Sequence, residues 1–241
     1  MTYEPRTYRR YTISEDLVSF RVTVFETDLF ISSDRDLSDE AEAEINRLRR
    51  DIESYIKKNP DFKEALEPVA LDKRAPLIVK DMIEFSSDAG VGPMAAVAGA
   101  IAEGVGKRLL EFSSQIIVEN GGDIFISSKK PRIVGIYAGS SKLSKRIGLK
   151  VESDYTPCGV CTSSATVGHS LSFGKADAVT VLSKSASLAD AAATSLCNRV
   201  QVKDDIEKTI SYGKNIKGVD GIVIIFQDTL GVWGNIKLVD I

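Results

Sequence analysis

An aspartate and a threonine that could bind a cation occur in the stretch Ser187 to Asn198. Asp190 and Thr194 are four residues apart, so on a helix both side chains would project from one face. Carboxylate and hydroxyl oxygens are hard donors that suit Mg²⁺ or Mn²⁺, which complete their shells with water and phosphate. The alternative is local: an acid favoured by the helix dipole, and a threonine bonding back to a carbonyl.

A second candidate is the turn Asn120-Gly121-Gly122-Asp123, which stands between two predicted strands. Glycine supplies the positive φ of a tight hairpin, so the turn can be explained without a ligand. In the functional interpretation, Gly121 and Gly122 let the backbone approach a nucleotide, and Asp123 accepts a hydrogen bond from a ribose or base. The local sequence leaves both interpretations open.

The third group consists of two thiols and an imidazole. Cys158 and Cys161 form a C-x-x-C pair, which could be a redox pair, a persulfide relay or part of a soft-metal site. A zinc site would need Cys197 and His169 as further ligands, and inert reduced thiols are the remaining alternative. His169 is the only histidine, so imidazole proton transfer must use it; a structural role is its alternative.

The strands that would position these residues follow from alternating hydrophobicity and turn residues. Leu17 to Phe25 and Asp28 to Ser32 are predicted to form a hairpin. Further strands are predicted as a meander over Gln115 to Glu119, Ile124 to Ser127, Arg132 to Tyr137 and Ile147 to Val151, and then over Ala178 to Leu182, Gly221 to Phe226 and Gly231 to Leu238. The Thr-, Ser-, Gly- and Cys-rich residues 154–168 are predicted to form a long loop.

Helical spacing predicts a first helix from Ser38 to Asn59 and a short second helix that starts at Pro60. Later helices are predicted over Met94 to Glu111, Ser187 to Asn198 and Asp204 to Tyr212. The helix that begins at Met94 is lined with Ala and Gly, and each interior Gly costs ~1 kcal/mol relative to Ala. Such a surface predicts close approach, either by tight packing on a sheet or by a ligand.

The composition is that of a globular protein, with 43% hydrophobic and 27% charged residues among 241. The net charge of -3 comes from mixed signs, so nucleic acid is not an expected partner. No apolar run approaches the ~20 residues that span a bilayer, and the N-terminus does not resemble a signal peptide. We therefore expect a cytoplasmic, single-domain protein (1–241) with reduced cysteines and no membrane association.

Three segments, in this order, resemble the ApbE-like superfamily, whose best-known members are FAD:protein FMN transferases, and in particular a divergent prokaryotic branch. Gly92-Pro93-Met94-Ala95-Ala96-Val97-Ala98-Gly99 is similar to the small-residue helix of that branch. Val118 to Ile124 is similar to the family's strand-Asn-x-Gly-Gly-Asp-Ile segment. Ser187-Leu188-Ala189-Asp190-Ala191-Ala192-Ala193-Thr194 is similar to its Ala-Asp-Ala-x-Ala-Thr helix, the most specific of the three.

The resemblance implies an α+β, T-fold-like protein of mixed, mainly antiparallel sheets packed with helices. It also implies that Asp190 and Thr194 hold Mg²⁺ beside the pyrophosphate of FAD, and that Gly121, Gly122 and Asp123 help form the flavin nucleotide pocket. Ser163 lies in a stretch similar to a Ser-Thr-Ser-Gly-like segment of the transferases, which implies a place in the same pocket.

The chain departs from the family after the histidine. His169 matches the His of a His-Ile-x-Asp-Pro-x-Thr-Gly motif, but the next residues, Ser170-Leu171-Ser172-Phe173-Gly174, lack Asp-Pro and reach the glycine two residues sooner. The C-x-x-C pair is no part of the transferase signature. The resemblance therefore implies metal and nucleotide binding more directly than transferase catalysis.

Three hypotheses follow. The first is a flavin-handling enzyme that binds FAD with Mg²⁺ and uses His169 in attack on a phosphoryl group. The second is a sulfur-relay or thiol-redox protein that uses Cys158 or Cys161 on a retained scaffold. The third is a non-catalytic binding or assembly protein, in which the small-residue helix serves an interface such as that of a homo-oligomer.

Overall fold

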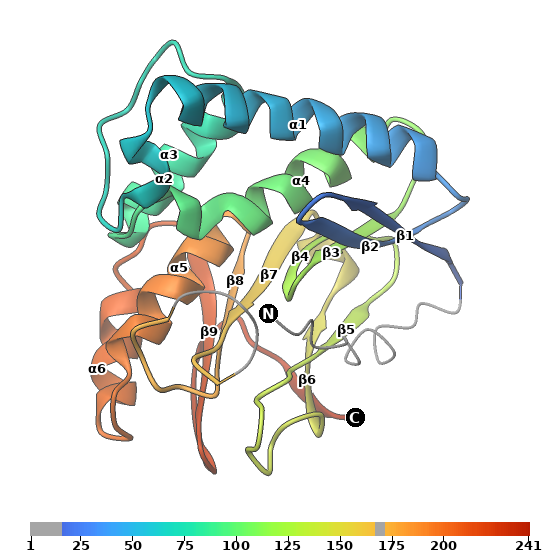
Figure 1. The fold of residues 1–241 in the computed structure, drawn as a ribbon. Helices are drawn as coiled ribbons and strands as arrows, with labels where there is room; N and C mark the ends of the chain where they lie inside the picture. The colour runs from blue at the N-terminus through green and yellow to red at the C-terminus, as the bar shows by residue number, and fades with distance from the viewer. Residues whose placement is uncertain (1–15, 167–171) are drawn as a thin grey trace.

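A computed structural model describes residues 16–166 and 172–241. Within these residues the framework is an antiparallel sheet of eight strands in the order β1-β2-β3-β4-β7-β8-β9-β10 (Figure 1). The strands are β1 (Val18–Val24), β2 (Thr27–Ser33), β3 (Ile116–Asn120), β4 (Asp123–Ser127), β7 (Cys158–Ser163), β8 (Ala178–Ser183), β9 (Val219–Phe226) and β10 (Thr229–Gly234). The mixed, mainly antiparallel α+β fold expected from the sequence is confirmed.

The helices cover one face of this sheet (Figure 1). They are α1 (Ser38–Lys58), α2 (Asp61–Glu64), α3 (Leu77–Ala89), α4 (Val97–Leu109), α5 (Ala186–Arg199) and α6 (Asp205–Gly213), and a 3-10 turn, η2 (Pro93–Ala96), precedes α4. The predicted end of the first helix at Asn59 is confirmed, whereas the short α2 begins at Asp61, one residue later than predicted, with Pro60 as its N-cap. α4 and α5 pack against each other and against the central strands.

No single helix among those described is long and apolar enough to cross a membrane. α3 and the segment Pro93–Leu109 are together long and apolar enough for a membrane span, but the two parts are bent by 104° relative to each other.

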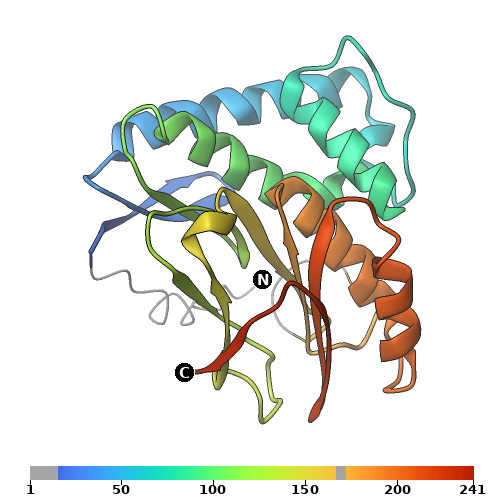
Figure 2. The same cartoon turned by 180° about the vertical axis from the view of Figure 1, so that it is seen from behind.

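A smaller sheet of order β11-β6-β5 lies on the other side of the large sheet, as Figure 2 shows from behind. Its strands are β5 (Arg132–Gly135), β6 (Ile147–Val151) and β11 (Leu238–Asp240), and a 3-10 turn, η3 (Ser153–Tyr155), follows β6. The predicted meander is therefore wrong in one respect, because β3 and β4 belong to the large sheet whereas β5 and β6 belong to the small one. The predicted strand Gly231 to Leu238 is likewise divided, at Gly234, whose φ is +86°.

The segment from Cys158 to Ser163 is a central strand, β7, and not part of a long loop as predicted. It pairs with β4 on one side and β8 on the other. The helices cover one of its faces and the small sheet covers the other, so nearly all of its residues are buried. A strand that is buried on both faces lacks the alternation that marks a half-exposed strand.

Alternation along the strands divides the interior into two layers. One layer fills the space between the large sheet and the helices and includes Ile31, Val118, Phe125, Val181 and Leu109. The other layer fills the space between the two sheets and includes Ile117, Ile126, Val160, Val223 and Leu149. Odd-numbered β7 residues face the helices and even-numbered ones face the small sheet, which decides where its functional groups lie.

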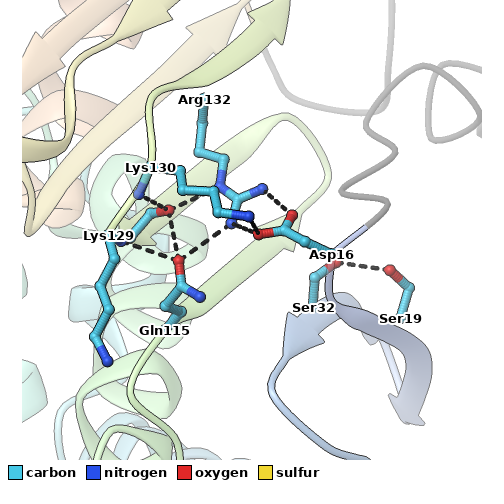
Figure 3. Close-up of polar contacts among 8 residues, drawn as sticks. Asp16, Ser19, Ser32, Gln115, Lys129, Lys130 and Arg132 are labelled. Atoms are coloured by element: carbon cyan, nitrogen blue, oxygen red, sulfur yellow. Dashed lines mark hydrogen bonds and ion pairs between the residues drawn. The ribbon is translucent and has the colours of Figure 1, made fainter.

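Polar side chains connect the two sheets where β4 crosses to β5 (Figure 3). Asp16, just before β1, accepts hydrogen bonds from Arg132 Nη1 at 2.6 Å and Nη2 at 3.1 Å, and lies 3.1 Å from Lys130 Nζ. The Arg132 side chain is only 10% exposed. It also donates to Ser128 Oγ at 2.7 Å and to Gln115 Oε1 at 3.2 Å, so its guanidinium is held from several elements.

Candidate functional site

Asp190 lies on the face of α5 that meets α4. α5 begins after Ser185, whose hydroxyl accepts a hydrogen bond from the backbone of Leu188 and caps the helix. The Asp190 carboxylate accepts a hydrogen bond of 2.8 Å from the backbone N–H of Gly99 on α4. The side chain is buried with only 8% of the residue exposed, so this carboxyl group is fixed inside the molecule rather than at its surface.

Glycines of the small-residue helix make this approach possible. A Cβ at Gly99 would lie 2.2 Å from the carbonyl oxygen of Ala186 and 2.8 Å from Cβ of Asp190. A Cβ at Gly106 would lie 2.1 Å from the ring of Phe125 on β4. The prediction of tight packing on a sheet is therefore confirmed at Gly106, and at Gly99 the close neighbour is a second helix.

The turn at Gly121 and Gly122 is the hairpin between β3 and β4. Both glycines have positive φ, +72° and +113°, which explains the residue type by conformation. The N–H of Gly122 donates to Glu119 Oε1 at 3.0 Å, and its carbonyl accepts from the backbone of Thr162 at 3.3 Å. The backbone groups of Gly122 are thus used inside the protein, and the turn is bonded directly to β7.

Asp123 and Asp190 come from distant parts of the chain and interact on the helix side of the sheet. Burial raises the pKa of Asp123 well above its usual range, and the charges of Asp190 and Glu119 raise it further. Burial also raises the pKa of Asp190, to about 7, although the backbone amides of Gly99 and Ala98 oppose the shift. Two carboxyl groups in this environment favour a shared proton or a bound cation.

Cys161 is the nearest neighbour of Asp123 across the strands, because the two residues are paired in register between β4 and β7. Its thiol donates a hydrogen bond of 3.3 Å to the carbonyl of Ala186. Burial and the charges of Asp123 and Asp190 raise its pKa well above the usual value. The thiol is therefore a neutral, buried neighbour of the carboxyl pair.

Further along α5, Thr194 follows Asp190 after four residues and Cys197 follows it after seven. Thr194 is half-buried, and Cys197 is buried. Cys197 is hydrogen-bonded with Ser163, the last residue of β7, and lies 3.3 Å from Ser172 Oγ. We call this set the α5 strip; its members are Asp123, Cys161, Ser163, Asp190, Thr194 and Cys197.

The α5 strip brings together most of the residues singled out in the sequence, with one exception among the cysteines. Cys158 lies on the opposite face of β7, in the layer between the two sheets, because residues three apart in a strand face opposite sides. Burial raises its pKa to about 12. Since Cys158 and Cys161 are separated by the strand itself and are both fully buried, the sulfur-relay alternative is not supported.

Two other predictions, the role of His169 and a metal site, depend on which residues the structure describes. His169 lies outside the described residues, so its catalytic role stays a prediction. Among residues 16–166 and 172–241, no three His, Cys, Asp or Glu side chains are grouped as they would be around a metal ion. Two carboxylates, by contrast, are as many as a Mg²⁺ site commonly takes from protein.

Two further residues at the site, Glu119 and Gly99, were not predicted to belong to it. Glu119 shapes the glycine turn through Gly122, and Gly99 orients Asp190. Their contacts depend on the tertiary arrangement of the helices and strands. The one available sign was the cost of a glycine inside a helix, which predicts close approach but not the partner.

Family comparison identifies the chain. The family model described as "AbpE bacteria" matches residues 9–230. The chain belongs to this ApbE-like family. Among its relatives are the UPF0280 proteins of Methanocaldococcus jannaschii, 45% identical over 222 residues and 90% of each chain, and of Methanococcus vannielii, 45% identical over 227 residues and 92% of each chain.

Solved ApbE structures share the fold at low sequence identity. The flavin transferase ApbE from Vibrio cholerae has a TM-score of 0.60 at 14% identity, covering 90% of this chain and 96% of that chain. The ApbE protein from Thermotoga maritima has a TM-score of 0.56 at 14% identity, covering 89% and 96%. The ApbE-like superfamily predicted from three short segments is thus confirmed, and the likeness in structure concerns the fold.

Proposed function

We propose that this ApbE-like protein binds FAD together with a divalent cation along the α5 strip, and that the site serves flavin-transferase-type phosphoryl chemistry. The observation that carries the proposal is the pair of buried carboxyl groups, Asp123 and Asp190. The charges of Asp190 and Glu119 both act on Asp123 there. An anionic pyrophosphate would be repelled by this charge unless a cation accompanied it.

The donor set fits a hard divalent ion such as Mg²⁺. Asp190 and Thr194 would supply oxygen ligands from one face of α5, and Asp123 a carboxylate from β4. The ion would neutralise charge on the pyrophosphate. Gly99 orients Asp190, Gly121 and Ser163 would border the nucleotide, and His169 is the proposed group for proton transfer at the attacking atom.

The sharpest test is calorimetric titration of FAD into the full-length protein, with Mg²⁺ and with a chelator. We expect Mg²⁺-dependent binding, and we expect Asp190→Asn to weaken it at least about tenfold, as loss of one good charge-assisted contact does. The matched control is Asp39→Asn, which removes an exposed carboxylate on α1.

Two results would contradict the proposal. One is the absence of FAD binding to the unaltered protein at any Mg²⁺ concentration. The other is binding that is equally tight in chelator and in the Asp190→Asn variant, since the carboxyl pair would then play no part.

A further inference from the structure

Phe173 presents an aromatic ring beside the C-terminal end of α5. The residue is 55% exposed, yet its backbone is fixed on both sides. Its N–H donates to Asn198 Oδ1 at 2.8 Å, and its carbonyl accepts from Gln201 Nε2 at 2.6 Å. The backbone around an exposed side chain is therefore anchored to the last turn of α5 and to the residues that follow it.

The neighbours of Phe173 are held equally closely. Ser172 lies 3.3 Å from the thiol of Cys197, a member of the α5 strip. A Cβ at Gly174 would lie 1.8 Å from the carbonyl oxygen of Cys197, so only glycine permits this approach. Ser172, Phe173 and Gly174 thus pack onto α5, and the ring of Phe173 extends from a backbone that is held in place.

Other exposed phenylalanines differ in their surroundings. Phe25 and Phe112 each have an arginine guanidinium over the ring, Arg49 at 5.2 Å and Arg108 at 5.0 Å. Within the described part of the chain, no aromatic or cationic group lies over the ring of Phe173. With respect to these residues, the ring of Phe173 presents a face that a planar ligand could contact.

The spacing along α5 matches a dinucleotide. Asp190 and Asn198 are eight residues apart, which is about 12 Å at a rise of about 1.5 Å per residue. FAD carries one planar ring system on each side of its pyrophosphate, joined through a sugar or a sugar alcohol. A pyrophosphate held near Asp190 would therefore bring one of these ring systems toward the end of α5 that anchors Phe173.

We propose that Phe173 stacks on a ring system of the bound dinucleotide and is a binding residue of the α5 strip. The inference rests on the proposed function. It assigns the aromatic recognition to a residue in the segment where the chain departs from the family's histidine motif. Stacking tolerates any planar π-system, so the same contact suits the isoalloxazine or the adenine.

The test is a set of titrations with Mg²⁺ present, using FAD, FMN and ADP as probes. We expect Phe173→Ala to weaken FAD binding about 5- to 100-fold, the range for loss of one aromatic stack. Phe173→Tyr keeps the ring and should restore binding, together with the shift of the flavin absorbance band if the isoalloxazine is the partner. FMN and ADP identify which ring system loses affinity.

The control is Phe112→Ala, an exposed phenylalanine away from the strip, which should bind FAD like the unaltered protein. Equal FAD affinity of Phe173→Ala and the unaltered protein overturns the inference, and it leaves the proposed function standing if Asp190→Asn still loses binding. Absence of FAD binding to the unaltered protein overturns both. An equal loss in Phe173→Ala and Phe173→Tyr also counts against stacking, because the ring is retained in the second variant.

Discussion

The carboxyl groups of Asp123 and Asp190 are held in an environment that disfavours their charged forms. Burial is the largest cause at both residues, and for Asp123 the neighbouring carboxylates add to it. The two buried carboxyl groups thus lower the stability of the folded protein relative to apolar side chains at the same positions. Buried acids with raised pKa values are frequent at functional sites, where a ligand or proton compensates them.

Asp190 should make stability depend on pH in the ligand-free protein. Its pKa is raised from 3.8 to about 7 on folding, so the neutral form is favoured in the folded state. The contribution to stability is full below about pH 4 and is lost as the pH rises toward 7. We expect Asp190→Asn to raise the free energy of unfolding at pH 8 by a few kcal/mol at most, at about 1.4 kcal/mol per pKa unit.

Urea denaturation at pH 5 and pH 8, in chelator, measures this effect. The exposed Asp39→Asn change should leave the pH dependence as it is, and Mg²⁺ should stabilise the unaltered protein at pH 8 but not Asp190→Asn. A variant that is less stable than the unaltered protein at pH 8 would show that Asp190 is charged and compensated within the ligand-free fold.

At the residue scale, the sequence pointed to individual candidate residues but not to how they meet. Asp123 and Asp190 were recognised from short segments, and the structure brings them into electrostatic contact. The pairing of Cys158 with Cys161 was a reasonable hypothesis from spacing alone. It was wrong because strand geometry, rather than sequence distance, decides which side of a sheet a side chain faces.

At the scale of the elements, the packing of α4 depends on two kinds of glycine. At Gly99 an added Cβ would strike backbone atoms of α5, which cannot move without displacing Asp190. At Gly104 it would meet Cδ1 of Leu48 at 2.9 Å, the far end of a flexible side chain. The two positions lie on the same helix and therefore form a matched pair.

We expect Gly99→Ala to lower the free energy of unfolding by about 2 kcal/mol, the usual range for overpacking, and to weaken Mg²⁺-dependent FAD binding. Gly104→Ala should be close to neutral, because a better helix former offsets a small side-chain adjustment by up to ~1 kcal/mol. Chemical denaturation measures the stability of the two variants, and calorimetry measures their affinity for FAD. Equal losses in both variants would mean that helix contacts in general, rather than the approach to Asp190, are at stake.

The burial of Cys158 and Cys161 in β7 predicts that their thiols react slowly in the folded protein. Burial raises the pKa values of both Cys158 and Cys161, and thiolates are the reactive species. We expect both thiols to be alkylated slowly in the folded protein and rapidly after unfolding in urea, as followed by mass spectrometry with iodoacetamide. Formation of a disulfide between these two cysteines under mild oxidation, without loss of the fold, would contradict the placement of β7.

The elements that were predicted correctly have residue types or a spacing typical of their structure. α1 and β1 each have one exposed and one buried face, and β8 is a buried, mainly apolar run; the predicted ranges of all three agree closely with the structure. β7 carries no such pattern because both its faces are covered, and its Gly, Cys, Thr and Ser are typical of loops. The failure thus has a physical cause in the combination of burial on both faces with residue types that are typical of loops.

For the whole molecule, the relation between the two sheets depends on a few polar residues as well as on their shared apolar layer. Asp16 precedes the edge strand β1, and Arg132 opens β5 of the small sheet. The sequence distance between them is 116 residues, so no local pattern could have predicted the contact. The same holds for the division of the strands between two sheets, which follows from the path of the chain after β4.

The contact of Asp16 with Arg132 should be visible as a pH-dependent stabilisation. Hydrogen bonds from Arg132 and Lys130 hold the pKa of Asp16 well below its ordinary 3.8. A lowered pKa adds stability above the unfolded value, and this stability is lost as the pH falls. We expect Asp16→Asn to lower the melting temperature modestly at pH 7, with the difference shrinking below about pH 4.

Thermal melts monitored by circular dichroism at pH 3 and pH 7 provide the measurement. Asp36→Asn is a suitable control, because Asp36 is exposed and accepts hydrogen bonds locally, from Ser38 two residues away. A melting temperature unchanged by Asp16→Asn at pH 7 would show that the apolar layer alone keeps the sheets together.

The ends of the segment between β7 and β8 lie close together, which lets the length of this segment change during evolution. Ser163 and Val179 are cross-strand partners, and the N–H of Ala165 donates to the carbonyl of Ala176 at 3.0 Å, so the segment leaves and returns at nearly one point. The entropy of closing such a loop changes only slowly with its length. Residues can therefore be gained or lost around position 169 while Asp123 and Asp190 keep their places, which lets reaction chemistry evolve on an unchanged scaffold.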